Sequence, residues 1–225
     1  MCTIAERIKN IKEQIANGNA YGEKVVLVAA TKMQTAQDIN QAIAAGVDAV
    51  AENKAQEFRD KYGEVNDCPR HFIGHLQTNK LKYVVGKVDL IHSCDRDELL
   101  KEISNLSVKK GIATNLLLQI NIGEEESKGG YAYEQAKAAF LQAMNMPNVC
   151  VKGFMAMLPD IDDETLLRAL VRKMRALFEW AKTQSQTVEF LSMGMSGDYM
   201  LCIEEGSNMI RVGSTIFGAR NYGQI

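Results

Sequence analysis

The chain has 225 residues, of which 46% are hydrophobic and 24% are charged. This length can bury a large core, either in one α/β barrel or in two small domains. Its 26 basic and 28 acidic residues give a net charge of −2, so nothing indicates a surface for nucleic acid or for an anionic membrane. We therefore expect a small-molecule partner.

The five cysteines are scattered and include no C-x-x-C pair, which argues against a disulfide framework and a structural zinc site. The N-terminal segment 1–18 has no apolar signal core, because polar residues separate its isoleucines. No run of about 18 apolar residues occurs, so we expect no membrane span. These features together predict a cytoplasmic protein with reduced thiols.

The N-terminal segment predicts a helix. Four isoleucines recur at spacings of four, three and four residues, which places them on one helix face. Thr3 and Glu6 have the spacing of a capping box, so the helix is expected to begin directly after Thr3.

Short apolar runs then alternate with helical stretches, which is the pattern of a βα protein. The runs predict eight strands, at residues 25–30, 48–53, 71–74, 89–94, 114–122, 151–157, 189–195 and 209–218. Helices are predicted at residues 35–46, 54–62, 163–182 and 197–205, and another from residue 95. Asp95 and Glu98 are spaced as a second capping box.

Eight strands, three prolines and no linker-like segment predict a single domain over residues 1–225. The expected α/β fold is a closed (β/α)8 barrel of the TIM type with an extra N-terminal helix, and an open doubly wound sheet is the alternative. Functional residues of such barrels gather at the C-terminal ends of the strands. The side chains at or beside these ends are Thr31, Lys32, Glu52, Asn53, Gly74, His75, Ser93, Asn121, Met157, Met195, Ser196 and residues 213–215.

Lys32 follows the first predicted strand and allows two interpretations. It could be the first solvated residue of a loop. Alternatively, burial at a barrel mouth would lower the pKa of its amine, and the neutral amine could form a Schiff base with an aldehyde or ketone.

The ends of the last two strands predict a phosphate site. Ser196 stands where a helix begins after the seventh strand, and Gly213 to Thr215 stand near the end of the eighth. Backbone N–H groups and hydroxyls there suit a phosphate dianion, and barrels commonly bind phosphate at this place. The alternative is that Ser196 only caps the helix and that residues 213–215 only form a turn.

Arg211 lies inside an apolar run, where an unpaired guanidinium would be costly to bury. We therefore expect it to project into the pocket and to have a partner there. A strand-end lysine, an arginine inside the barrel and a phosphate site together indicate a pyridoxal 5′-phosphate (PLP) site.

Six segments carry a family resemblance: VAATK, AENKAQEF, HFIGHLQTNK, NIGEEESKGG, SMGMSGDY and IRVGSTIFGARNY occur in this order. Together they closely resemble the YggS/PROSC family of PLP homeostasis proteins, which is related in fold to the barrel domain of alanine racemase. The resemblance extends from about residue 4 to residue 222. It implies a fold-type III PLP barrel.

By this resemblance Lys32 forms the internal aldimine, which is the covalent link to PLP. Ser196, Gly213 and Ser214 would bind the phosphate, and Arg211 would approach the pyridine nitrogen. The expected cofactor-binding residues are Lys32, Asn53, His75, Met195, Ser196, Arg211, Gly213 and Ser214.

Three functions are compatible with these residues. The first is a homeostasis protein that holds PLP, with little or no turnover, and hands it to PLP-dependent apo-enzymes. The second is a PLP-dependent amino-acid racemase, which requires an acid or base on each face of the cofactor. The third is a lysine Schiff-base aldolase with a phosphorylated substrate, which would leave Arg211 and the ordered motifs unexplained.

We expect the first function. The alanine racemases take the opposing tyrosine from a second domain, which we do not expect in this chain, and no tyrosine falls at a predicted strand end. We therefore expect no catalytic residues. Separately, we expect the protein to be a monomer.

The remaining polar residues predict no further chemistry. His71, His75 and His92 lack the spacing of metal ligands, so we expect no metal. The acidic residues 124–126 are predicted to form a solvated loop, and Lys128 either lies over the pocket or belongs to a plain turn.

Overall fold

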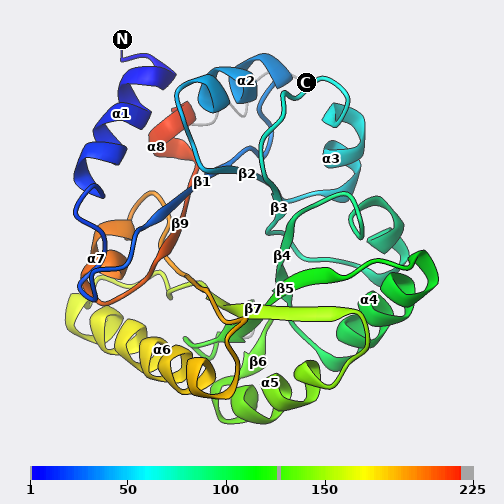
Figure 1. Ribbon diagram of the computed structural model, residues 1–225. Helices are drawn as coiled ribbons and strands as arrows, with labels where there is room; N and C mark the ends of the chain where they lie inside the picture. Colours follow the sequence, from blue (N-terminus) through cyan, green and yellow to red (C-terminus); the bar gives the residue numbers. More distant parts are fainter. Residues whose placement is uncertain (1, 126–127, 219–225) are drawn as a thin grey trace.

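The computed structural model describes residues 2–125 and 128–218. Within them, eight parallel strands form a closed barrel with helices around it (Figure 1). The strands are β1 (Val26–Ala30), β2 (Ala49–Glu52), β3 (Arg70–Phe72), β4 (Leu90–Cys94), β5 (Thr114–Asn121), β7 (Val149–Ala156), β8 (Phe190–Ser192) and β9 (Met209–Val212). They pair in this order, and β9 returns to β1. The predicted (β/α)8 barrel is confirmed.

The helices are α1 (Ile4–Gln14), α2 (Ala36–Ala44), α3 (Ala55–Lys61), α4 (Asp97–Lys110), α5 (Ala136–Met144), α6 (Glu164–Gln184), α7 (Tyr199–Glu204) and α8 (Ser214–Phe217). Two 3-10 turns, η1 (Thr78–Tyr83) and η2 (Tyr133–Gln135), and a short strand β6 (Tyr131–Ala132) beside β5 complete the described elements. No prediction covers η1, β6, η2 or α5.

The extra N-terminal helix is confirmed as α1, which packs against α2 and α8 (Figure 1). Its capping box is also confirmed. The Thr3 hydroxyl accepts from the Glu6 N–H at 3.2 Å, and the Glu6 carboxylate accepts from the Thr3 N–H at 2.7 Å. Ile8 and Ile11 are fully buried, so the predicted apolar face is the one that contacts the barrel.

The predicted capping box at Asp95 and Glu98 is wrong. Helix α4 begins at Asp97 with Arg96 at its N-cap, and no side chain caps it. The Asp95 carboxylate instead accepts from Arg96 at 2.5 Å and lies 3.2 Å from His75 Nδ1. These contacts with Arg96 and His75 direct the Asp95 carboxylate away from the N-terminus of α4.

The last two strands are shorter than predicted. β8 ends at Ser192, because the chain turns at Gly194, whose φ of 102° is left-handed and whose position leaves no room for a Cβ beside Tyr199. β9 ends at Val212, and the apolar residues that follow form α8. Ile216 is buried there with the apolar residues of α1 rather than in the barrel wall.

The largest core lies between the barrel and the helices α4, α5 and α6. Ile103, Phe140 and Phe178 from these helices pack with the barrel residue Phe154. A separate apolar layer fills the barrel interior, formed by Val28, Ala49, Ala51, Leu90, Leu117, Met155 and Met209. The barrel is thus a packed core rather than a pore.

Several chain-wide features bear on function. All five cysteines are free thiols. None of the described helices is both long and apolar enough to cross a membrane. In residues 2–125 and 128–218, no three His, Cys, Asp or Glu side chains lie close enough to hold a metal ion. The assignment of residues 1–225 to one domain stays a prediction.

Candidate functional site

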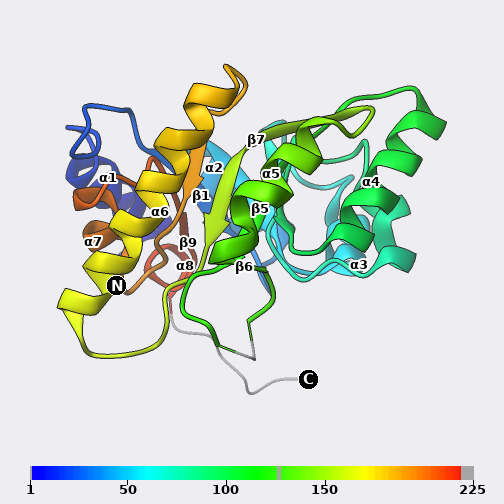
Figure 2. The ribbon, with the colours of Figure 1, turned by 90° about the horizontal axis from the view of Figure 1, so that it is seen from below.

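A cavity of about 290 Å3 opens at the C-terminal ends of the strands. Figure 2 shows the loops after β5 and β7 and the helix α8 on this side of the barrel. The cavity is lined by Ala30, Lys32, Gln34, Asn53, Ile73, Met155, Met157, Met195, Ser196, Gly197, Arg211, Gly213, Ser214 and Gly218. Seven of the eight predicted site residues are among them, and His75 is not.

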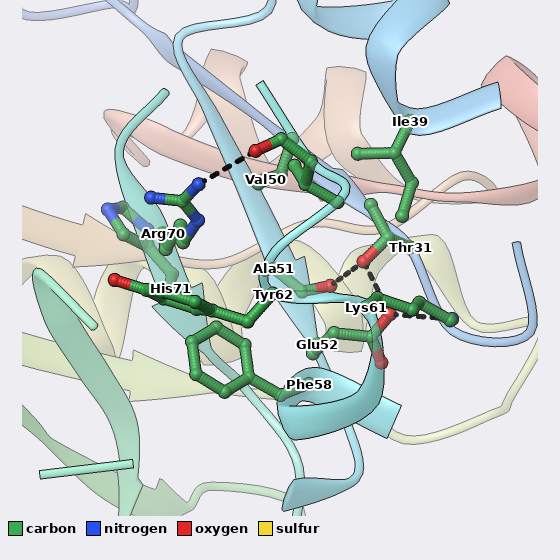
Figure 3. A pocket seen from close by; sticks show the side chains of 11 residues that line it. Thr31, Ile39, Val50, Ala51, Glu52, Phe58, Lys61, Tyr62, Arg70 and His71 are labelled. Carbon is green, nitrogen blue, oxygen red and sulfur yellow. Dashed lines mark hydrogen bonds and ion pairs between the residues drawn. The ribbon is translucent and has the colours of Figure 1, made fainter. Parts of the chain in front are cut away.

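Lys32 and Asn53 follow two strand ends that are tied together. The buried hydroxyl of Thr31 donates to the Ala51 carbonyl oxygen at 3.0 Å and to the Glu52 carboxylate at 2.8 Å (Figure 3). Lys61 donates to the same Glu52 oxygen at 3.2 Å. Thr31 directly precedes Lys32, and Glu52 directly precedes Asn53. These bonds therefore hold the backbone from which both lining residues project.

The residue after Lys32 has a strained backbone. Met33 has a φ of 62°, which is uncommon for a side chain with a Cβ. Its N–H donates to Glu57 of α3 at 3.0 Å, and Lys61 donates to the same carboxylate at 3.2 Å. Burial by itself raises the pKa of Glu57, but the bonds from Met33, Lys61 and Lys54 and the charge of Lys61 outweigh it, so the pKa is lowered. Helix α3 therefore holds the loop of Lys32 through a charged acceptor.

Ser196 bridges the two loops predicted to bind phosphate. Its hydroxyl oxygen accepts from the N–H groups of Gly213 at 3.2 Å and Thr215 at 3.3 Å. The alternative in which Ser196 caps the next helix is wrong, because Asp198 occupies the N-cap of α7. The Asp198 carboxylate accepts from the Met195 N–H at 2.5 Å, which fixes the turn before the helix.

Arg211 is 4% exposed and reaches the cavity from β9. Its Nη1 donates to the carbonyl oxygen of Ser192 at 2.8 Å and to the hydroxyl of Ser192 at 2.7 Å, and its Nη2 donates to the Ala156 carbonyl oxygen at 3.0 Å. All three acceptors are uncharged. Burial lowers the pKa of Arg211 to about 10, so it is a cation at neutral pH.

His75 lies away from the cavity wall, where its Nδ1 is 3.2 Å from Asp95 Oδ2 and its side chain is 65% exposed. Lys128 is not a lining residue either. Its ammonium donates to Glu125 at 2.9 Å and to the Leu158 carbonyl oxygen at 2.9 Å. Glu126 and the end of the last motif, including Tyr222, lie outside the described residues.

Several lining residues were not predicted to bind a ligand. Ile73 directly follows β3, so its position at a strand end was the available signal. Met157 was recognised at a strand end but not assigned to the cofactor. Gln34 lies in a loop, where neither spacing nor residue type gives a signal.

Comparison with known proteins decides the family. Residues 3–221 match the family model described as alanine racemase, N-terminal domain. The chain belongs to this family. Its resemblance to the PLP homeostasis proteins is also confirmed, since it is 38% identical to the pyridoxal phosphate homeostasis protein of Aquifex aeolicus over 97% of this chain and 96% of that protein.

Two proteins of known structure are similar in fold to this chain. PipY of Synechococcus elongatus is 30% identical, and its structures without and with PLP superpose with TM-scores of 0.86 and 0.83 over 96% of this chain and 100% of that chain. An alanine racemase of Clostridium difficile has a TM-score of 0.76 over 99% of this chain and 58% of that chain. At 13% identity, this second likeness shows the fold alone.

Proposed function

We propose that this protein binds PLP covalently through Lys32 and takes part in PLP homeostasis, with little or no catalytic turnover. One observation carries the proposal: Lys32, Arg211 and the loop residues Ser196, Gly213 and Ser214 line the same cavity. The PLP-bound structure of PipY, which is similar over its whole length, supports it.

The lining residues suit the parts of PLP. When bound, PLP supplies an aldehyde that condenses with a primary amine, and Lys32 is the lysine that lines the cavity. Ser196, Gly213 and Ser214 would hold the phosphate with hydroxyl and N–H donors. Arg211 would face the pyridine nitrogen and keep it unprotonated, because two donors cannot share one hydrogen bond.

The same cavity gives little support for racemase chemistry. Racemisation needs a second acid or base opposite Lys32, and tyrosine serves that role in alanine racemases. The described lining residues include no tyrosine. The hydroxyl of Tyr131 donates to Asp97 and that of Tyr199 to Gln14, so both are engaged elsewhere. Arg211 would also weaken the cofactor as an electron sink.

The first test is covalent capture of PLP. Purified protein is mixed with PLP and reduced with borohydride, and the modified peptide is identified by mass spectrometry. We expect modification at Lys32 and its loss in Lys32→Ala. The exposed Lys24, which lies before β1 and away from the cavity, provides the control Lys24→Ala, which should be modified at Lys32 as in the wild type. Equal modification of Lys32→Ala at another lysine would contradict the proposal.

A second measurement separates a homeostasis protein from a racemase. Amino acids are incubated with the PLP-loaded protein in deuterated water, and α-proton exchange is followed by NMR. We expect slow or no exchange, and rapid exchange would favour the racemase. Transfer to PLP-dependent apo-enzymes, a monomeric state and a cytoplasmic location belong to the same proposal.

A further inference from the structure

Four polar side chains form a buried hydrogen-bonded chain across the barrel. Arg211 Nη1 donates to Ser192 Oγ at 2.7 Å, Ser192 Oγ lies 3.1 Å from His92 Nδ1, and His92 Nε2 lies 3.0 Å from His71 Nδ1. Their exposed fractions are 4%, 0%, 0% and 7% in this order. We call this set the Arg211–His71 chain. It begins at the cavity wall on β9 and runs through β8 and β4 to β3.

The donors of the Arg211–His71 chain can be assigned from Arg211. A guanidinium only donates, so Ser192 Oγ must accept from it. The hydroxyl proton of Ser192 is then donated to His92 Nδ1, so this nitrogen must be unprotonated. His92 consequently carries its proton on Nε2 and donates to Nδ1 of His71, which carries its own proton on Nε2.

The opposite direction is less favourable. If His92 Nδ1 donated to Ser192, the hydroxyl proton of Ser192 would have no acceptor among the hydrogen bonds of the described residues, although Ser192 is fully buried. Burial also lowers the pKa of His71 to about 4 and that of His92 well below its usual value, so each neutral ring carries one proton. One neutral tautomer of each ring therefore satisfies the whole set.

We propose that His92, acting through Ser192, is a positioning residue that holds the Arg211 guanidinium in the cavity wall. Arg211 makes its described hydrogen bonds to uncharged oxygens, so its orientation depends on where their lone pairs point. His92 directs the hydroxyl proton of Ser192 away from Arg211, which leaves a lone pair for the guanidinium. The effect on cofactor binding rests on the proposed function, whereas the tautomers do not.

The tautomers are measured first, in the protein without PLP. The chain has three histidines, so labelling with 15N-histidine gives few ring signals, and His75→Gln identifies the exposed one. We expect Nε2-protonated rings at His71 and His92 near pH 7. A proton on Nδ1 of His92, or two protons on that ring, would overturn the assignment. Ser192→Ala should shift the His92 ring signals, whereas His75→Gln should not.

Binding of PLP is measured next, by absorbance titration of variants whose folding is checked by circular dichroism. Leu has a similar size to His but accepts no hydrogen bond, and Asn has an acceptor close to the position of Nδ1. We expect His92→Leu to weaken PLP binding roughly tenfold, the size of one hydrogen bond to a charged group, and His92→Asn to restore most of it. Ser192→Ala should resemble His92→Leu, and Ser192→Thr should resemble the wild type.

The outcomes separate the two proposals. Wild-type affinity in folded His92→Leu and in Ser192→Ala would overturn the positioning role. If His92→Leu does not fold, Ser192→Ala against Ser192→Thr decides the question. If the wild type takes up no PLP at all, the proposed function fails, and the histidine tautomers still support or overturn the Arg211–His71 chain.

Discussion

His71 and His92 lie inside the barrel wall, where they contact each other and almost no water. Burial lowers the pKa of His71 to about 4, although the charge of Asp89 opposes this shift. Burial lowers the pKa of His92 well below its usual value, and the positive charge of Arg211 acts in the same direction. The Arg211–His71 chain therefore contains one cation, Arg211, and two neutral rings.

The lowered pKa of folded His71 predicts that the stability of the protein depends on pH. In the unfolded chain a histidine takes up a proton near pH 6.5, whereas folded His71 does so only near pH 4, so the unfolded state binds more protons between these values. The free energy of unfolding should fall as the pH drops through this window. We expect a contribution of about 2 kcal/mol from His71 between pH 7.5 and pH 5.

Urea denaturation at the two pH values measures this effect. Carboxylates also change their protonation over this pH range, so the loss of stability in the wild type is compared with the loss in histidine variants. His71→Asn should show a smaller loss of stability on acidification than the wild type, and His75→Gln, at an exposed position, should show the same loss. An identical loss in His71→Asn would mean that the ring is not kept neutral by the fold.

At the scale of elements, β1 and α3 jointly position Lys32. The strained backbone of Met33 is held by Glu57 of α3, and the end of β1 is tied to β2 through Thr31 and Glu52. A non-glycine residue in the left-handed region costs about 1–3 kcal/mol, so it persists only where its surroundings hold it. Glu57 makes the contact that does so.

Substitution of Glu57 tests this arrangement. Glu57→Ala should lower the free energy of unfolding by about 1 kcal/mol, through the loss of the Met33 bond, and should slow borohydride-trapped capture of PLP at Lys32. Glu57→Gln retains a hydrogen-bond acceptor, so its stability and its capture rate should lie between those of Glu57→Ala and the wild type. The exposed Glu64 offers the control Glu64→Ala, and a capture rate in Glu57→Ala equal to that of this control would exclude the role.

At the scale of the whole molecule, Arg175 joins segments that are distant in the sequence. It projects from α6, donates to both oxygens of Glu23 at 2.6 and 3.1 Å, and donates to the Gly206 carbonyl oxygen at 2.8 Å. Glu23 precedes β1, and Gly206 precedes β9. The arginine therefore ties the longest helix to the two loops that enter the neighbouring strands β1 and β9.

We call the contacts of Arg175 with Glu23 and Gly206 the Arg175 clamp. It predicts a second effect of pH on stability, at acidic pH. Burial by itself raises the pKa of Glu23, but bonds from Arg175, Asn19 and Lys182 lower it to about 2. The stability from Glu23 is complete above the usual carboxylate pKa of about 4.3 and is lost as the pH falls towards 2. Glu23→Gln should destabilise the protein by about 2 kcal/mol at pH 7, less than for a fully buried pair because Glu23 is partly exposed.

Denaturation curves at pH 7 and pH 2.5 test the clamp. The difference between Glu23→Gln and the wild type should shrink at the lower pH. Glu13, whose pair with Lys9 is exposed at 3.9 Å, provides a control, and Glu13→Gln should have little effect at either pH. A difference for Glu23→Gln that is unchanged at pH 2.5 would contradict the lowered pKa.

Elements with strong local signals could be predicted from the amino-acid sequence. Thr3 and Glu6 cap α1 because their spacing suffices for the two bonds, and the apolar runs of β1, β4, β5 and β7 mark buried strands. The alternation of strands and helices predicted the closed barrel, and the strand ends predicted seven residues of the cavity wall. These features depend on neighbours within a few positions along the chain.

Other features depend on the folded structure: the ends of β8 and β9, the contact of Asp95 with His75 in place of a cap on α4, and the absence of His75 from the cavity lining. The hydrogen-bond partners of Arg211 depend on it as well. The physical reason is distance along the chain. Ser192 contacts a residue 19 positions away and another 100 positions away, and such bonds form only after the barrel brings the strands together.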